Sequence, residues 1–123
     1  MFIVNEDKSM SITRGDAAAF DVEATHQGGA YTFKTGDVLR FKVFEQKNCT
    51  NVVLCKDTYV NADTTSVKVS LDGEDTKVGE VNSKPVTYWY EVELNPDTKP
   101  QTIIGYDDDG PKVFKVFPEG AEV

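Results

Sequence analysis

Histidine, cysteine and tryptophan are scarce in this chain of 123 residues, which contains one His, two Cys and one Trp. Triad-type catalysis needs a nucleophile beside a base, most often histidine, that an acid orients. The single histidine, His26, precedes Gly28-Gly29 in an expected hairpin turn, where a histidine is usually solvated. A histidine-rich metal site is excluded, and the sequence shows no cofactor motif. We therefore expect a protein that is not an enzyme and needs no cofactor; a hydrolase using a carboxylate pair is a weaker possibility.

Basic residues are also few: 13 Lys and Arg stand against 21 Asp and Glu, a net charge of −8. Binding to nucleic acid or to anionic membranes requires clustered basic residues, so neither partner is expected. No apolar run approaches the roughly 20 residues of a membrane-spanning helix. The N-terminal MFIVNEDKSM has three apolar residues after the initial Met, followed by charges, which is not the pattern of a secretory signal peptide.

The two cysteines, Cys49 and Cys55, cannot close a tetrahedral zinc site by themselves. Cys55 ends the apolar run Val52–Cys55 and is interpreted as a small buried hydrophobe. Cys49 lies in an expected turn, and a disulfide would require that turn and the strand to fold back on each other. We expect two free thiols, as in a reducing compartment.

Residues that favour strands are abundant, whereas helix formers are not: the chain has 16 Val, 12 Thr and 13 aromatic residues against four Leu and seven Ala. Apolar and polar residues alternate, or apolar residues run together, in segments separated by turn residues. These segments are Ala18–Ala24, Leu39–Val43, Val52–Cys55, Val67–Leu71, Tyr88–Leu94, Ile103–Tyr106 and Val113–Phe117, with a short strand at Ser9–Thr13.

Turn residues such as Gly36-Asp37, Asp72-Gly73 and Asp109-Gly110 fall between these segments. Seven to eight short strands with turns every 8–14 residues are typical of an antiparallel sandwich or barrel. We expect an all-β protein with one domain over residues 1–123: an immunoglobulin-like antiparallel β-sandwich with little or no helix. The run Val52–Cys55 is interpreted as a central strand or one buried on both faces.

The acidic run Asp107-Asp108-Asp109 precedes Gly110 and raises the question of a calcium site. Consecutive aspartates do not follow the alternating ligand pattern of a calcium loop. An Asp-Gly hairpin turn is the favoured interpretation, and Asp107 and Asp109 are weak metal-ligand candidates only.

Trp89 is the residue most suggestive of binding. By alternation it faces away from Tyr88 and Tyr90, so either the tryptophan or the tyrosines lie on an outer face. An exposed aromatic surface often marks a contact with a partner, although packing of Trp89 under the loop 72–85 is the more conservative interpretation. The candidate binding residues are therefore Trp89, Tyr88 and Tyr90.

Four segments carry a resemblance that covers nearly the whole chain: ITRGDAAAFDVEA (Ile12–Ala24), YTFKTGDVLRFKVFE (Tyr31–Glu45), VVLCKDTYV (Val52–Val60) and KPVTYWYEVELNPDTKPQTIIGYDDDGPKVFKVFPEG (Lys84–Gly120). The chain resembles small prophage-encoded proteins of Gram-positive gut bacteria. More distantly, it is similar to the N-terminal β-sandwich domain of phage upper-baseplate proteins.

The resemblance implies a non-enzymatic structural or interaction protein of a phage or prophage, associated with the tail or baseplate. Its expected partners are other phage tail proteins or further copies of itself. It would lie in the bacterial cytoplasm during assembly and then in the virion. The alternative is a small carbohydrate- or protein-binding module that uses Trp89 and nearby tyrosines as a stacking platform.

Overall fold

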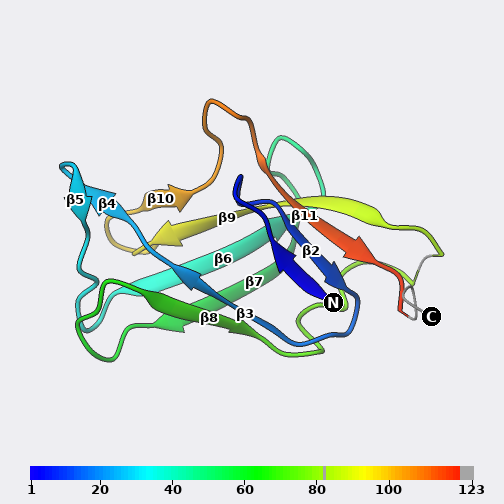
Figure 1. Cartoon of the computed structure of the whole chain (residues 1–123), viewed down its shortest axis with the longest axis horizontal. Coiled ribbons are helices and arrows are strands. Elements are labelled where there is room, and N and C mark those ends of the chain that lie inside the picture. Colours follow the sequence, from blue (N-terminus) through cyan, green and yellow to red (C-terminus); the bar gives the residue numbers. More distant parts are fainter. Residues whose placement is uncertain (82, 120–123) are drawn as a thin grey trace.

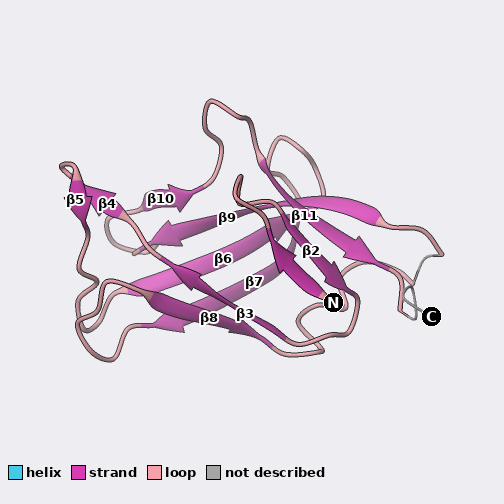
Figure 2. Cartoon of the chain, viewed as in Figure 1, coloured by secondary structure: helices cyan, strands magenta, loops and turns pink. Residues whose placement is uncertain are grey.

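A computed structural model describes residues 1–81 and 83–119, and it contains β-strands but no helix in these residues (Figure 2). The all-β prediction is confirmed. No helix that could cross a bilayer is present in the described residues. The strands are β1 (Phe2–Val4), β2 (Met10–Thr13), β3 (Ala18–Val22), β4 (Thr25–His26), β5 (Gly29–Ala30), β6 (Val38–Phe44), β7 (Val52–Tyr59), β8 (Val67–Leu71), β9 (Val86–Leu94), β10 (Gln101–Ile104) and β11 (Lys112–Phe117).

The strands form two layers (Figure 1). The larger sheet has the order β1-β2-β11-β9-β6-β7, and β10 pairs with β9. All its pairs are antiparallel except β2 and β11, which run parallel. The second layer is the antiparallel pair β3–β8, and β4 and β5 form a separate small hairpin.

The expectation of an immunoglobulin-like sandwich stays a prediction, and the strand order is compatible with it. Variable-type sandwiches place strands G, F, C and C′ side by side in one sheet and strands B and E together in the other. Here β11, β9, β6 and β7 follow the first order, and β3 and β8 form the second pair.

The hydrophobic core fills the space between the layers, as the alternation predicts. The inward residues of β6 (Leu39, Phe41 and Val43) are fully buried. The Phe41 ring contacts Phe20 of β3 at a centroid distance of 5.3 Å and Tyr90 of β9 at 5.5 Å. Burial of these apolar side chains, at roughly 1.5–3 kcal/mol each, is the main contribution that holds the two layers together.

The interpretation of Val52–Cys55 as a central strand is wrong, because β7 is the last strand of the larger sheet. Its residues at both ends of the run are exposed: Val52 retains 52% of its accessible surface, and Cys55 is exposed rather than buried. The continuous apolar run reflects an irregularity in the register with β6, where Val43 pairs with Leu54 but Phe44 pairs with Val52.

One edge of β9 is shared by two strands. Val92–Leu94 pair with β10, whereas Val86–Tyr90 pair with β11. The intervening residues 105–111 leave the sheet, because Ile104 and Lys112 pair with β9 residues only two positions apart. This excursion contains the expected Asp-Gly turn, in which the Gly110 N–H donates to the carbonyl of Asp107 at 2.8 Å.

Candidate functional site

The three aromatic residues singled out on β9 do not lie on one surface. Tyr88 and Tyr90 are 6% and 1% exposed and belong to the core, whereas Trp89 is partly exposed on the opposite, solvent-facing side of the sheet. Strand alternation therefore orients Trp89 as predicted. The proposed stacking platform of all three rings is wrong, since two of them are inaccessible.

Trp89 is the centre of an apolar row that crosses four strands of the larger sheet. It is in register with Phe44 of β6 and Val113 of β11, and Phe44 is in register with Val52 of β7. Phe44 is 4% exposed yet does not belong to the core cluster, because it lies on the outer face. We call Val52, Phe44, Trp89 and Val113 the Trp89 row.

Sequence reasoning missed Phe44, although the signal was present. Phe44 has the same strand parity as Arg40 and Lys42, which identifies the outer face of β6. The ammonium of Lys42 lies 5.8 Å from the centroid of the Phe44 ring, a cation–π distance. A charged residue thus borders the row directly.

Arg40 begins a band of ion pairs beside the Trp89 row. Its guanidinium binds both carboxylate oxygens of Asp57 across β6 and β7, at 2.8 and 3.1 Å. It also contacts Asp97 at 3.1 Å. The hydrogen bonds to Asp57 and then to Asp97 raise the pKa of Arg40, and the hydrogen bond from Arg40 lowers the pKa of Asp57.

Lys42 continues this band toward Trp89. Its ammonium lies 2.5 Å from a carboxylate oxygen of Glu93 and 3.5 Å from one of Glu91. Burial would lower the pKa of Lys42, but the two carboxylates raise it above its ordinary value. We call Arg40, Lys42, Asp57, Glu91, Glu93 and Asp97 the charged band; it holds four acids against two bases.

The two thiols are free and differ in exposure. Cys49, in the β6–β7 loop, is partly buried; burial, with a further effect of Glu91, raises its pKa. Lys42 also acts electrostatically on Cys49, so this loop lies close to the charged band. Cys55 is on the outer side of β7, in register with Lys42, and is exposed.

The weak metal candidates are engaged with protein groups. Both carboxylate oxygens of Asp107 lie 2.9 Å from the ammonium of Lys112, and Oδ1 also accepts the N–H of Asp109 at 2.9 Å. His26 is exposed at the end of β4, in the expected hairpin. Within residues 1–81 and 83–119, no group of three or more His, Cys, Asp or Glu side chains is placed to hold a metal ion.

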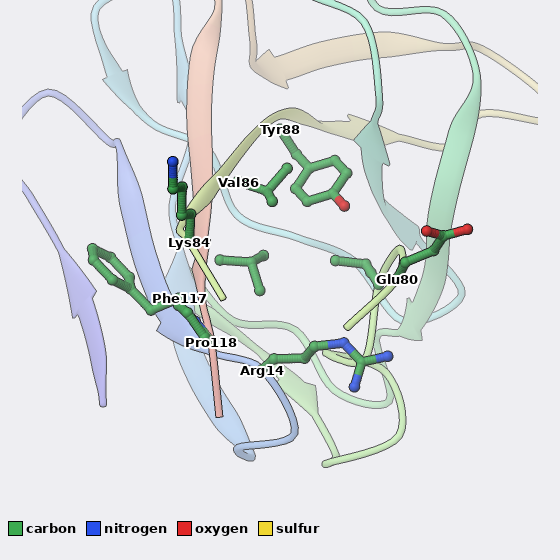
Figure 3. Close-up of a pocket in the computed structure, with 9 residues that line it drawn as sticks. Arg14, Glu80, Lys84, Val86, Tyr88, Phe117 and Pro118 are labelled. Carbon is green, nitrogen blue, oxygen red and sulfur yellow. The ribbon is translucent and has the colours of Figure 1, made fainter. Parts of the chain in front are cut away.

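A small cavity is lined by Arg14, Glu80 and Lys84 together with Tyr88, whose ring extends from β9 toward the segment that carries Glu80 (Figure 3). Its volume is about 10 Å³, enough for about one water molecule. The guanidinium of Arg14 binds Glu119 at 3.1 Å and the carbonyl of Gly79 at 3.3 Å. These contacts tie loops together, and the cavity is too small for a substrate.

Comparison with known proteins supplies no site to transfer. No protein-family model matches the chain, and searches of the curated proteins and of the solved structures give no significant match. The Trp89 row and the charged band are therefore candidates on their geometry alone.

Proposed function

We propose that this protein is a non-enzymatic structural or interaction protein of a phage or prophage, associated with the tail or baseplate. The resemblance of four segments to prophage and baseplate proteins motivates the phage assignment. The Trp89 row carries the interaction assignment, because it gives the solvent side of the larger sheet an apolar centre. The protein would be assembled in the bacterial cytoplasm and then reside in the virion.

The partner that fits this surface is a protein with an apolar centre and a basic rim. Tryptophan is enriched at the energetic centres of interfaces, where a surrounding polar rim excludes water. The charged band holds four acids against two bases, and the chain as a whole carries −8. Electrostatic complementarity with a basic surface accelerates association and disfavours acidic competitors. We expect such a partner among the other tail proteins.

Co-purification with the products of genes adjacent to its own coding sequence tests the proposal, with light scattering to detect self-association. Trp89→Ala should weaken binding by about 2 kcal/mol or more, as for an interface centre. Thr87→Ala, on the same face and exposed, is the matched control and should leave it unchanged. A strict monomer that binds none of these products contradicts the proposal.

A carbohydrate-binding module is the second candidate, and the partly exposed Trp89 ring is the observation that favours it. Tyr88 and Tyr90 are buried, so such a module would stack a sugar on one ring only. A glycan array separates the two functions: binding that Trp89→Ala abolishes favours the module, and absence of binding to any glycan removes it.

A further inference from the structure

Strand β10 has one unpaired edge. The opposite edge of β9 is occupied by β6, so β10 and β11 lie in succession along the same side of β9. The outer edge of β11 is covered by β2, but β10 pairs only with β9 among the described residues. The backbone N–H and C=O groups on the outer edge of β10 therefore have no strand partner there.

Among residues 1–81 and 83–119 no strand lies on the outer side of β10, because the chain before β2 turns away. Met10 is in register with Phe114, so an extension of β2 by two residues would reach Lys112 and stop short of β10. Instead, Lys8 takes a positive φ of 72°, and the Asn5 N–H donates to the carbonyl of Ser9 at 2.9 Å. This tight turn connects β1 to β2, so the residues before it pair with β2 and do not continue toward β10.

A groove runs along this position. A hollow of about 580 Å³ lies against the β4–β5 hairpin, and one of about 310 Å³ lies against the excursion 105–111. Both are lined by Lys8, Glu23 and Ile103, which join them into one groove. Figure 1 shows β10, β4 and β5 on the same side of the molecule as this excursion.

The groove is lined by partly buried apolar residues and by one charged residue of each sign. Ala24, Ile103 and Ile104 are partly buried and pack against the core, so an added apolar side chain would complete their burial. Lys8 and Glu23 are exposed, and within the described part of the chain neither side chain has an ion-pair partner. An occupant with one acidic and one basic side chain would satisfy both.

We propose that β10 accepts an extended segment of a partner protein as an added strand. In such β-augmentation, main-chain hydrogen bonds provide affinity and alternate side chains provide specificity. The added segment places an apolar residue over Ile103 and Ala24. On the same face, its neighbours two residues away are basic toward Glu23 and acidic toward Lys8. This site is separate from the Trp89 row and does not depend on it.

NMR titration of the ¹⁵N-labelled full chain with two end-capped peptides tests the proposal. The first peptide is Thr-Lys-Thr-Val-Thr-Glu-Thr, and the second has the reverse order, Thr-Glu-Thr-Val-Thr-Lys-Thr. One order should bind more tightly, shift the amides of Thr102, Ile103 and Ile104, and slow the hydrogen exchange of those β10 amides that point away from β9. If neither order produces saturable shifts at β10 up to about 5 mM, the limit of weak specific binding, the proposal fails.

Backbone methylation separates strand addition from binding through side chains alone. Alternate residues of a strand point their N–H groups to opposite edges. One peptide is N-methylated at its three non-threonine residues, and a second at the two threonines between them. One of these peptides should therefore lose binding, and the other should keep it. Equal affinity of both methylated peptides would overturn strand addition.

Charge exchange tests whether the charged residues that line the groove contact the peptide. Glu23→Lys should lower the affinity for the preferred peptide about fivefold, the effect of one exposed ion pair. A peptide with Glu in place of Lys should recover that loss of affinity. Glu45→Lys, exposed in the β6–β7 loop, is the control that leaves affinity unchanged. Trp89→Ala should also leave it unchanged, so failure here and failure of the proposed function are distinguishable. Peptide binding insensitive to Glu23→Lys contradicts the proposed orientation.

Discussion

Asn95 donates a hydrogen bond from Nδ2 to Oδ1 of Asp37 at 3.1 Å, which joins the turn after β9 to the turn before β6. Asn95 also accepts the N–H of Val38 through its side chain at 2.9 Å. The second oxygen of Asp37 accepts the N–H of Lys34 at 2.9 Å and the hydroxyl of Tyr31 at 3.0 Å. One carboxylate thus fixes the entry into β6, whose inward residues are fully buried.

Replacement of Asp37 by Asn should lower the free energy of unfolding at pH 7 by about 1–3 kcal/mol. In either orientation the new amide NH₂ faces a donor, since both carboxylate oxygens accept hydrogen bonds. Urea denaturation measures the loss. Asp108→Asn, in an exposed turn, is the control and should change the free energy of unfolding little. Equal stabilities of the two variants would contradict this role of the Asp37 carboxylate.

The same carboxylate predicts acid sensitivity. Burial would raise the pKa of Asp37, but the hydrogen bonds from Lys34, Asn95 and Tyr31 hold it below the ordinary value of 3.8. A lowered folded-state pKa contributes stability above the unfolded-state value and loses it as pH falls through the folded-state value. The difference between the parent protein and Asp37→Asn should therefore shrink below about pH 4. A constant difference down to pH 2 argues against this linkage.

Gly79→Ala should destabilise the protein strongly. Gly79 has a φ of +67°, and an added Cβ would lie 2.1 Å from the hydroxyl oxygen of Tyr88. Tyr88 is 6% exposed, so its ring has little room to move. Gly28 has a φ of +81° with open space around it, so Gly28→Ala isolates the backbone strain of about 1 kcal/mol.

We expect Gly79→Ala to cost at least about 2 kcal/mol more than Gly28→Ala, because overpacking adds to strain. Denaturation midpoints provide the comparison. Adding Tyr88→Phe removes the clashing oxygen and should recover part of the loss. Failure of the double variant to recover would assign the effect to the backbone instead.

Local alternation was sufficient to predict the faces of the strands but not their neighbours. The opposite orientations of Trp89 and Tyr90 follow from a two-residue period, which any strand imposes. The exposure of Cys55 depends on β7 being the last strand, and that is decided by which distant segments pair. The same limit hid the unpaired edge at Ile103, since the turn at Lys8 that leaves it open lies far away in sequence.

The corrected position of Cys55 predicts unequal thiol reactivity. Thiolate is the reactive form, and burial raises the pKa of Cys49 while Cys55 is exposed. Iodoacetamide at about pH 8 should therefore alkylate the Cys49→Ser variant several-fold faster than the Cys55→Ser variant. Urea should remove the difference. Similar rates in the folded protein would indicate that the β6–β7 loop opens freely.

The single tryptophan makes the outer face directly observable. Trp89 is the only indole in the chain and is partly exposed, so acrylamide should quench its emission in the free protein. A partner that covers the Trp89 row should shift the emission to shorter wavelength and reduce quenching, because the indole loses contact with water. The β10 peptides should leave both signals unchanged, since their groove lies along the β10 edge and none of its lining residues belongs to the Trp89 row. If a bound tail protein leaves Trp89 fully quenchable, that protein contacts another surface, and the Trp89 row is not the docking site.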